Sequence, residues 1–128
     1  MMRIIVADDS SCARMFIKKC LEIVGLADAE ITEAENGKEA LDKIQAQSFD
    51  LLITDLSMPV MDGEALLKWV KGTPELLNLP VLVISSAGNP AREKKLLELG
   101  AFAVLGKPVS SVVLLKALEP LLEKEEDE

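Results

Sequence analysis

Near the middle of the chain, residues 51–63 read Leu51-Leu52-Ile53-Thr54-Asp55-Leu56-Ser57-Met58-Pro59-Val60-Met61-Asp62-Gly63. A short apolar run ends in one carboxylate, and a loop marked by proline and glycine follows at once. Apolar runs of this length are typical of strands that are buried on both faces of a parallel sheet. Because ligands collect at the carboxyl ends of such strands, we expect Asp55 to lie at the mouth of a cleft.

Similar apolar runs, each followed by a helical pattern, lie on both sides of this stretch. We expect strands at residues 3–7, 30–34, 51–54, 81–84 and 103–105. The helices are expected to start near Ser10 or Ser11, after an Asn36-Gly37 turn, at Gly63 or Glu64, at Pro90, and near Ser110 or Ser111. This alternation predicts an α/β fold, with a doubly wound parallel sheet, right-handed crossovers and helices on both faces.

The helical patterns also predict which side chains are buried. In the first helix, the apolar positions on one face are Ala13, Phe16, Ile17, Cys20, Leu21 and Val24. In the last helix they are Val112, Val113, Leu115, Leu118, Leu121 and Leu122. Pro120 interrupts that helix, where a proline costs about 3 kcal/mol, so we expect a kink or a break. The acidic residues 123–128 are expected to fray as a tail, which leaves residues 1–122 as the domain.

The composition indicates one globular domain and excludes several kinds of partner. A chain of 128 residues is long enough to bury a single core. Its formal charge of −8 argues against binding to nucleic acid or to anionic membrane surfaces. No apolar segment approaches the ~20 residues of a membrane helix, and no signal peptide is recognisable. We therefore expect a cytoplasmic location.

The chain contains two cysteines and no histidine. Cys12 and Cys20 fall in one expected helix with their Cα atoms ~12 Å apart along its axis, which is too far for a disulfide. We expect both to be small buried apolar residues. The absence of histidine removes His-based zinc sites, Ser-His and Cys-His nucleophile pairs, and any phosphohistidine carried on this chain.

Polar residues follow the apolar runs at the points where a parallel sheet gathers its strand ends: Asp8, Asp9, Asp55, Ser85 and Lys107. Carboxylates, water and a phosphoryl oxygen are the ligands that Mg²⁺ prefers. For the first two acids alone, an interaction with the helix dipole is an equally good explanation, but the third acid favours a metal site. An aspartate carboxylate can also carry a phosphoryl group, with Mg²⁺, an ammonium and a hydroxyl on its oxygens.

Taken together, these landmarks resemble the receiver domain of two-component response regulators. They are Asp8-Asp9, Asp55 followed by Met58-Pro59-x-Met61-x-Gly63, Ser85-Ser86, and Lys107-Pro108, in that order over almost the whole chain. The length is most similar to the stand-alone, CheY-like type, and it also fits a receiver cut from a longer regulator. The resemblance implies a flavodoxin-like fold with five parallel strands in the order 2-1-3-4-5 and five helices.

The resemblance also implies a role for each landmark. Asp55 would be the phosphoacceptor, supplied by a phosphohistidine on a sensor histidine kinase or a histidine phosphotransfer protein. Asp8 and Asp9 would hold Mg²⁺, aided by Asp55 and the backbone carbonyl of Ser57. Lys107 would contact the phosphoryl group, and the Lys107-Pro108 peptide would be cis. The hydroxyl that switches toward the phosphoryl group would be that of Ser85.

Some positions depart from the family pattern or tune it. Val104 stands at the usual position of the switch aromatic and has no ring to move between exposed and buried positions. Ser57 and Ala87 match the positions that tune the lifetime of the phosphoryl group, and Ala87 offers no amide or carboxylate to orient water. The expected readout surface consists of the helix at 90–99, the last strand and the final helix, whose surface Pro120 alters.

Two alternative functions stay open. A phosphorylation-independent pseudo-receiver would only dock partners; Val104 allows it, whereas the intact acidic set argues against it. A haloacid-dehalogenase-like phosphohydrolase would also use a strand-end aspartate with Mg²⁺, but it needs a general acid where this chain has Ser57, and a cap domain for which there is no room. We therefore expect a signalling module rather than an enzyme. It would be a monomer or weak dimer that docks on an unidentified downstream protein.

Overall fold

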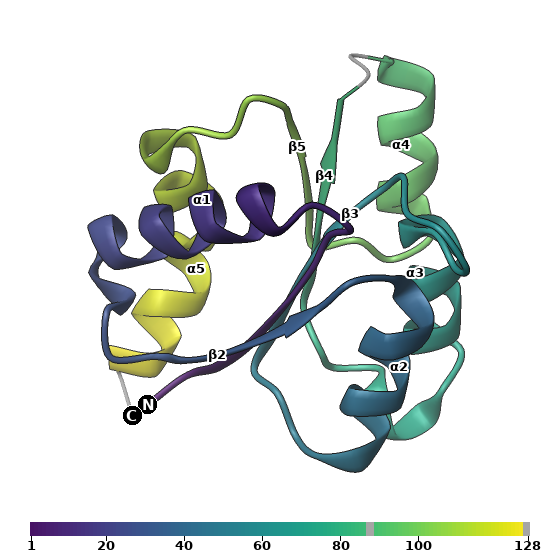
Figure 1. Ribbon diagram of the computed structural model, residues 1–128, viewed down its shortest axis with the longest axis horizontal. Coiled ribbons are helices and arrows are strands. Elements are labelled where there is room, and N and C mark those ends of the chain that lie inside the picture. The colour runs from purple at the N-terminus through teal and green to yellow at the C-terminus, as the bar shows by residue number, and fades with distance from the viewer. Residues whose placement is uncertain (87–88, 127–128) are drawn as a thin grey trace.

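The fold is built on a five-stranded parallel sheet (Figure 1). The computed structural model describes residues 1–86 and 89–126, apart from the side chains of 124–126. The strands are β1 (Arg3–Ala7), β2 (Glu30–Ala34), β3 (Leu51–Asp55), β4 (Val81–Ser85) and β5 (Ala103–Gly106). Their order in the sheet is β2-β1-β3-β4-β5, so the predicted strand order is confirmed. Each strand begins at the predicted residue and ends within one residue of its predicted end.

The direction of strand addition reverses between β1 and β3. From β1 the chain moves outward to β2, then returns past β1 to β3 and continues to β4 and β5. At such a reversal the crossover helices leave toward opposite faces of the sheet, so the carboxyl ends of the two strands border an open crevice. Ala7 pairs with Thr54 in the register of β1 and β3. The residues that follow them, Asp8 and Asp55, are therefore neighbours at this crevice.

In the part of the chain that the structure describes, five α-helices cover both faces of the sheet (Figure 1). One face carries α1 (Ser11–Leu21) and α5 (Ser111–Glu126); the other carries α2 (Gly37–Ala46), α3 (Gly63–Lys71) and α4 (Pro90–Glu98). A π-helical turn (Glu22–Leu26) follows α1, and a 3₁₀ turn (Pro74–Leu76) follows α3. The prediction of helices on both faces is confirmed.

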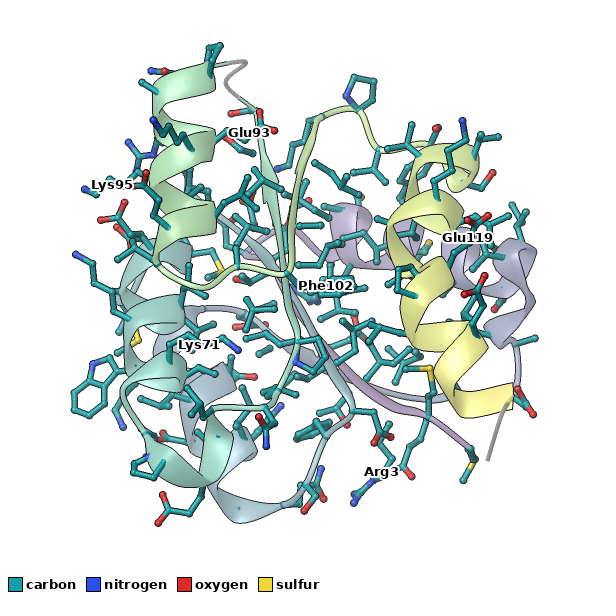
Figure 2. All side chains as sticks on the ribbon, turned by 180° about the vertical axis from the view of Figure 1, so that it is seen from behind. Arg3, Lys71, Glu93, Lys95, Phe102 and Glu119 are labelled. Carbon is teal, nitrogen blue, oxygen red and sulfur yellow. The ribbon has the colours of Figure 1, made fainter. Side chains whose placement is uncertain are left out.

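Successive strand residues point to opposite faces and so fill two cores. Ile4 and Ile53 pack with α1 and α5, whereas Ile5 and Leu52 pack with the other three helices. Side chains occupy the space on both sides of the sheet (Figure 2). The central strands β3 and β4 are buried along their whole length. Because each large apolar side chain contributes roughly 1.5–3 kcal/mol when buried, these strands anchor the fold and hold their ends still.

Polar caps start the helices that leave this edge of the sheet. The side chains of Ser10 and Asp62 accept backbone N–H bonds from the first turns of α1 and α3 at 3.2 and 2.8 Å. A cap of this kind contributes about 1 kcal/mol. Asn36, which we predicted in a turn with Gly37, instead caps α2 by accepting the N–H of Glu39 at 2.8 Å. The turn and the helix start are therefore the same feature.

The predicted buried faces of α1 and α5 are wrong at several positions. Phe16 was predicted to be buried but is 51% exposed, whereas Arg14 is buried, with 9% of its surface exposed. Likewise, Val112 and Val113 are exposed, whereas Leu114 is fully buried. Arg14 is buried because its donors find oxygen partners on the sheet, which offsets the cost of removing its charge from water.

The last helix continues past Pro120 without a break, so the predicted interruption takes at most the form of a kink. Pro120 is exposed, and water can satisfy the carbonyl that it leaves without an N–H partner. The helical backbone includes 123–126, while 127–128 lie outside the described residues. The division of the chain at residue 122 stays a prediction.

Both cysteine thiols are free. Cys20 is buried as predicted, but Cys12 is exposed, so its predicted burial is wrong. Cys12 lies in the first turn of α1, on the side that faces water.

Candidate functional site

The carboxyl edge of the sheet brings together three carboxylates and an amine. Asp8 and Asp9 follow β1, Asp55 ends β3, and one oxygen from each carboxylate lies within 4.8 Å of the other two. Lys107 comes directly after β5, and its Nζ lies 3.0 Å from Asp55 Oδ1 and 3.9 Å from Asp8 Oδ2. The convergence that we expected for these four residues is therefore present in the fold.

Much of this cluster is withdrawn from water. Asp8 is 2% exposed and Asp55 6%, while Asp9 is exposed. Burial raises the pKa of the Asp8 carboxyl above its ordinary value; the Ser10 N–H, 2.9 Å from Asp8 Oδ1, opposes this rise in pKa, and the charge of Asp55 adds to it. Lys107 balances one negative charge of the three. The cluster therefore keeps an excess of negative charge.

This donor set fits a hard divalent cation. Mg²⁺ takes oxygen ligands at about 2.0–2.1 Å in an octahedral shell, so adjacent ligands on one ion lie about 3 Å apart and opposite ligands about 4 Å apart. The three carboxylates, with oxygens within 4.8 Å of one another, need little adjustment to meet that spacing. A cation here would also relieve the repulsion among them. The residues present therefore satisfy the chemistry of a magnesium site.

Asp8→Asn is expected to stabilise the metal-free protein at neutral pH. The raised pKa means that the folded protein binds the Asp8 proton more tightly than the unfolded chain does, so stability is lost as the pH rises from the ordinary value of 3.8 through the folded-state pKa. In the presence of a chelator at about pH 7, the variant should have a higher free energy of unfolding than the wild type. Urea denaturation measures this difference, which should vanish below about pH 3. A variant that is less stable than the wild type at neutral pH would contradict the expectation.

Two glycines set the shape of the loop that follows Asp55. A Cβ on Gly63 would lie 2.3 Å from the backbone oxygen of Asp55, and the N–H of Gly63 donates to the carbonyl of Leu56 at 2.8 Å. Gly37, at the start of α2, has a similar role: a Cβ there would lie 2.5 Å from the carbonyl oxygen of Met61, which accepts the Gly37 N–H at 2.9 Å. The starts of α2 and α3 can approach this loop closely because neither glycine has a side chain.

Ser85 lies at the same edge, between β3 and β5. Its side chain is buried, and its carbonyl accepts the N–H of Lys107 at 2.9 Å. Ser85 also borders a small cavity of about 50 Å³ between the sheet and α4, to which Leu96 and Val104 contribute. Val104 is half-buried and lines this space.

Of the remaining predicted features, the structure confirms one and leaves the others as predictions. The Lys107-Pro108 peptide is cis, as the family resemblance implied. Ser57 is exposed in the loop after β3, and its roles in metal binding and in tuning stay predictions. Ala87 lies outside the described residues.

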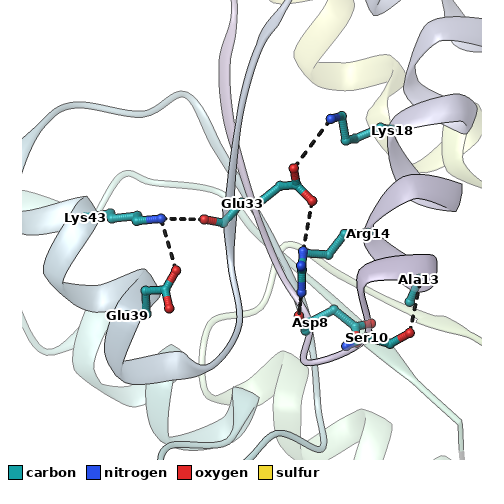
Figure 3. A network of polar contacts seen from close by, with 8 residues as sticks. All are labelled: Asp8, Ser10, Ala13, Arg14, Lys18, Glu33, Glu39 and Lys43. Atoms are coloured by element: carbon teal, nitrogen blue, oxygen red, sulfur yellow. Dashed lines mark hydrogen bonds and ion pairs between the residues drawn. The ribbon is translucent and has the colours of Figure 1, made fainter.

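Arg14 is a residue of this edge that our sequence reasoning missed. Its Nη1 donates to the backbone oxygen of Asp8 at 2.6 Å, and its Nε donates to Glu33 at 2.9 Å (Figure 3). Lys18 places a second cation 3.5 Å from the same carboxylate. The hydrogen bond from Arg14 holds the pKa of the Glu33 carboxyl below its ordinary value. An arginine in a first helix and a glutamate in a second strand are common surface residues, so the sequence contains no signal that they meet.

A broad hollow of about 1010 Å³ lies at the opposite end of the sheet. It is lined by residues that precede the strands, including Met2, Phe49 and Leu79. Asp50 in its lining accepts the backbone N–H of Arg3 at 2.8 Å, and the guanidinium of Arg3, labelled in Figure 2, lies over the Phe49 ring. Here Arg3 is paired with both Asp50 and Phe49, whereas three carboxylates converge at the carboxyl edge. We take the carboxyl edge as the functional site.

A family model, the response regulator receiver domain, matches residues 4–119. The chain belongs to the response-regulator receiver family. This receiver is 36% identical over 122 residues to the chemotaxis protein CheY1 of Helicobacter pylori, covering 94% of this chain and 97% of that protein. It is 35% identical over 121 residues to the gliding motility regulatory protein of Myxococcus xanthus, covering 94% of this chain but 15% of that relative. The structure of CheY4 of Vibrio cholerae matches with a TM-score of 0.82 and 32% identity over 94% of this chain and 98% of that one.

Membership of this family establishes the general function. A receiver is a signalling module of two-component systems that phosphorylation activates, and it is not a conventional enzyme. Receiver domains interact with kinases and with downstream targets, and they typically bind Mg²⁺; the acidic cluster suited to it is present here. Among residues 1–86 and 89–126, no helix combines the length and the apolar character that crossing a membrane requires.

Proposed function

We propose that this receiver accepts a phosphoryl group on Asp55 from a phosphohistidine on a histidine kinase or a histidine phosphotransfer protein. The observation that carries the proposal is the position of the Lys107 Nζ, 3.0 Å from Asp55 Oδ1, in a cluster with the carboxylates of Asp8 and Asp9. Because residues 1–128 contain no histidine, the phosphohistidine that supplies the group lies outside these residues.

The transfer is a single displacement at phosphorus. A carboxylate oxygen of Asp55 attacks, a P–O bond forms, and the P–N bond to the donor imidazole breaks. The electron pair of that bond leaves with the nitrogen, which takes up a proton, and an acyl phosphate remains on Asp55. The step requires in-line placement and positive charge on the equatorial phosphoryl oxygens. The position of Asp55 supports such placement, because Asp55 ends a strand that is buried along its whole length.

Lys107 meets part of the second requirement. Its ammonium lies within hydrogen-bond distance of Asp55, and its backbone N–H is held by Ser85. The residues that would hold Mg²⁺ are Asp8, Asp9 and Asp55, with the backbone carbonyl of Ser57. Bound there, Mg²⁺ supplies positive charge for the phosphoryl oxygens. The Ser85 hydroxyl donates a hydrogen bond to the same group.

The signal leaves through the surface formed by α4, β5 and α5. A phosphoryl group on Asp55 adds charge and acceptor oxygens, which draw Ser85 toward the site. Ser85 borders the cavity under α4, and Leu96 is the buried residue of that helix. A helix with so little buried surface shifts at low cost. Because Val104 has no ring to rotate, the response consists of a change in the packing of α4, and a downstream protein docks on the altered surface.

A phosphoryl-donor assay tests this function. With an acyl-phosphate donor and Mg²⁺, the wild type is expected to gain the mass of one phosphoryl group in a peptide that contains Asp55. Hydroxylamine, which cleaves acyl phosphates, should remove the label, and a chelator should prevent it. No label from either an acyl phosphate or a phosphohistidine donor would contradict the proposal. Steady turnover of a generic phosphate ester would instead indicate a phosphohydrolase.

A further inference from the structure

We infer that Arg14 is a positioning residue of the acidic cluster: its guanidinium fixes the turn at Asp8 and Asp9 so that both carboxylates reach one cation. The inference rests on the proposed function because it takes Mg²⁺ as that cation. The side chain of Arg14 donates to the Asp8 backbone and to Glu33, so it would not itself be a ligand of the cation. It acts through the backbone of Asp8.

The guanidinium of Arg14 connects α1 to the residue that follows β1 and to β2. Its Nη1 donates to the backbone oxygen of Asp8 at 2.6 Å, and its Nε donates to Glu33 Oε1 in β2 at 2.9 Å (Figure 3). The N–H of Asp8 donates in turn to the carbonyl of Ala34, also in β2, at 3.0 Å. A guanidinium is planar and holds its donors in a fixed fork. The end of β1 is therefore held from both sides of the Asp8 backbone.

The oxygen that Arg14 binds belongs to the peptide bond between Asp8 and Asp9. Because that peptide is planar, fixing the direction of its carbonyl also fixes the direction in which the chain enters Asp9. Asp9 is exposed, so core packing does not hold its side chain. The carboxylate of Asp8 is held separately by the N–H of Ser10 at 2.9 Å. Arg14 thus supplies at Asp9 a constraint that packing does not supply.

The effect of Arg14 is geometric more than electrostatic. The Glu33 carboxylate, at 2.9 Å, offsets the guanidinium charge, and this pairing permits an arginine that is only 9% exposed. A lysine at this position would carry the same charge on one nitrogen, without the rigid fork that binds two oxygens at once. Substitution can therefore separate charge from geometry.

The Mg²⁺ affinities of Arg14→Lys and Arg14→Met test the inference. By isothermal titration calorimetry, both variants are expected to bind Mg²⁺ about tenfold more weakly than the wild type, since loss of a group that orients metal ligands costs about 10–100-fold in affinity. The rise of the unfolding temperature with added Mg²⁺ is a second readout and should shift to higher Mg²⁺ concentration. In the labelling reaction, the Mg²⁺ concentration for half-maximal rate should rise about tenfold, with little change in the rate at saturating Mg²⁺.

Lys18→Met is the matched control. Lys18 also lies in α1 and also pairs with Glu33, at 3.5 Å, but its side chain is 41% exposed and its contact is with the carboxylate rather than with the Asp8 backbone. The Mg²⁺ affinity of this variant is expected to stay within about twofold of the wild type. Urea denaturation establishes that each variant is folded. If Arg14→Met does not fold, Arg14→Lys, which keeps a cation for Glu33, carries the test.

Each outcome decides between the alternatives. Folded Arg14 variants that bind Mg²⁺ as tightly as the wild type would overturn the inference, as would an equal loss in Lys18→Met. Full wild-type affinity in Arg14→Lys would show that charge alone suffices and would overturn the geometric account. Failure of the wild type to bind Mg²⁺ or to take up label would contradict the proposed function instead, whatever the Arg14 variants do.

Discussion

Asp55→Asn is expected to abolish labelling of this receiver by an acyl-phosphate donor in the presence of Mg²⁺. The substitution keeps the size of the side chain but replaces the nucleophilic carboxylate with an amide, which cannot form the acyl phosphate. The amide oxygen still offers an acceptor to Lys107, whose Nζ lies 3.0 Å from Asp55 Oδ1, so we expect the fold to persist. Intact-protein mass after reaction measures the effect: the wild type gains one phosphoryl group and the variant gains none.

The matched control is Asp42→Asn. Asp42 is an exposed aspartate of α2 that pairs with Lys38 at 2.6 Å, and it is not a member of the acidic cluster. Exposed pairs of this kind contribute about 0.2–1 kcal/mol, so the control should remain folded and take up label as the wild type does. Equal labelling of Asp55→Asn and wild type would remove Asp55 from the role of acceptor and move it to Asp8 or Asp9.

Gly63→Ala is expected to have the largest effect on stability, a loss of about 3 kcal/mol in the free energy of unfolding. The added Cβ would lie 2.3 Å from the carbonyl oxygen of Asp55 and 3.0 Å from the Cα of Leu56. Both are backbone atoms, so no side-chain rotation relieves the overlap. Moving the start of α3 away would weaken the 2.8 Å hydrogen bond from Gly63 to Leu56 and displace Asp55. We therefore expect slower labelling as well, and the midpoint of urea denaturation measures the loss of stability.

Gly106→Ala is the control for the change of residue type. A Cβ on Gly106 would meet no atom within 4 Å, and this glycine lies near the same edge of the sheet. Its free energy of unfolding should stay within about 0.5 kcal/mol of the wild type. If Gly63→Ala proves as stable as Gly106→Ala, the backbone contact at Asp55 is not a constraint on the loop.

The strands could be predicted because their signal is local. The runs at 3–7 and 30–34 coincide with β1 and β2, and the fully apolar run before Asp55 coincides with a strand that is buried on both faces. Capping is also local, as the side chain of Asn89 at the start of α4 shows by accepting backbone N–H bonds at 3.0 and 3.2 Å. The positions of the strands, which depend on a few neighbouring residues, are therefore read correctly from the sequence.

Helix faces were predicted less well because apolar spacing ignores what the neighbouring elements offer. Phe16 was assigned to the core on spacing alone and is exposed, whereas Arg14 is buried. The partners that make this burial favourable are the Asp8 carbonyl and the Glu33 carboxylate, and Glu33 lies in a strand that follows α1 in the chain. A charged residue on an otherwise apolar face gives no sign that such partners exist.

The residue order alone placed Asp8, Asp9, Asp55 and Lys107 at one edge of the sheet, because buried apolar runs form parallel strands and the carboxyl ends of parallel strands coincide. The contacts made there were decided by packing: the 3.0 Å separation of Lys107 from Asp55, the close approach of Gly63 to the Asp55 backbone, and the attachment of Arg14 to Asp8. Each joins groups from different elements. Such contacts depend on how helices and strands pack against one another. The residue pattern within a single element does not predict that packing.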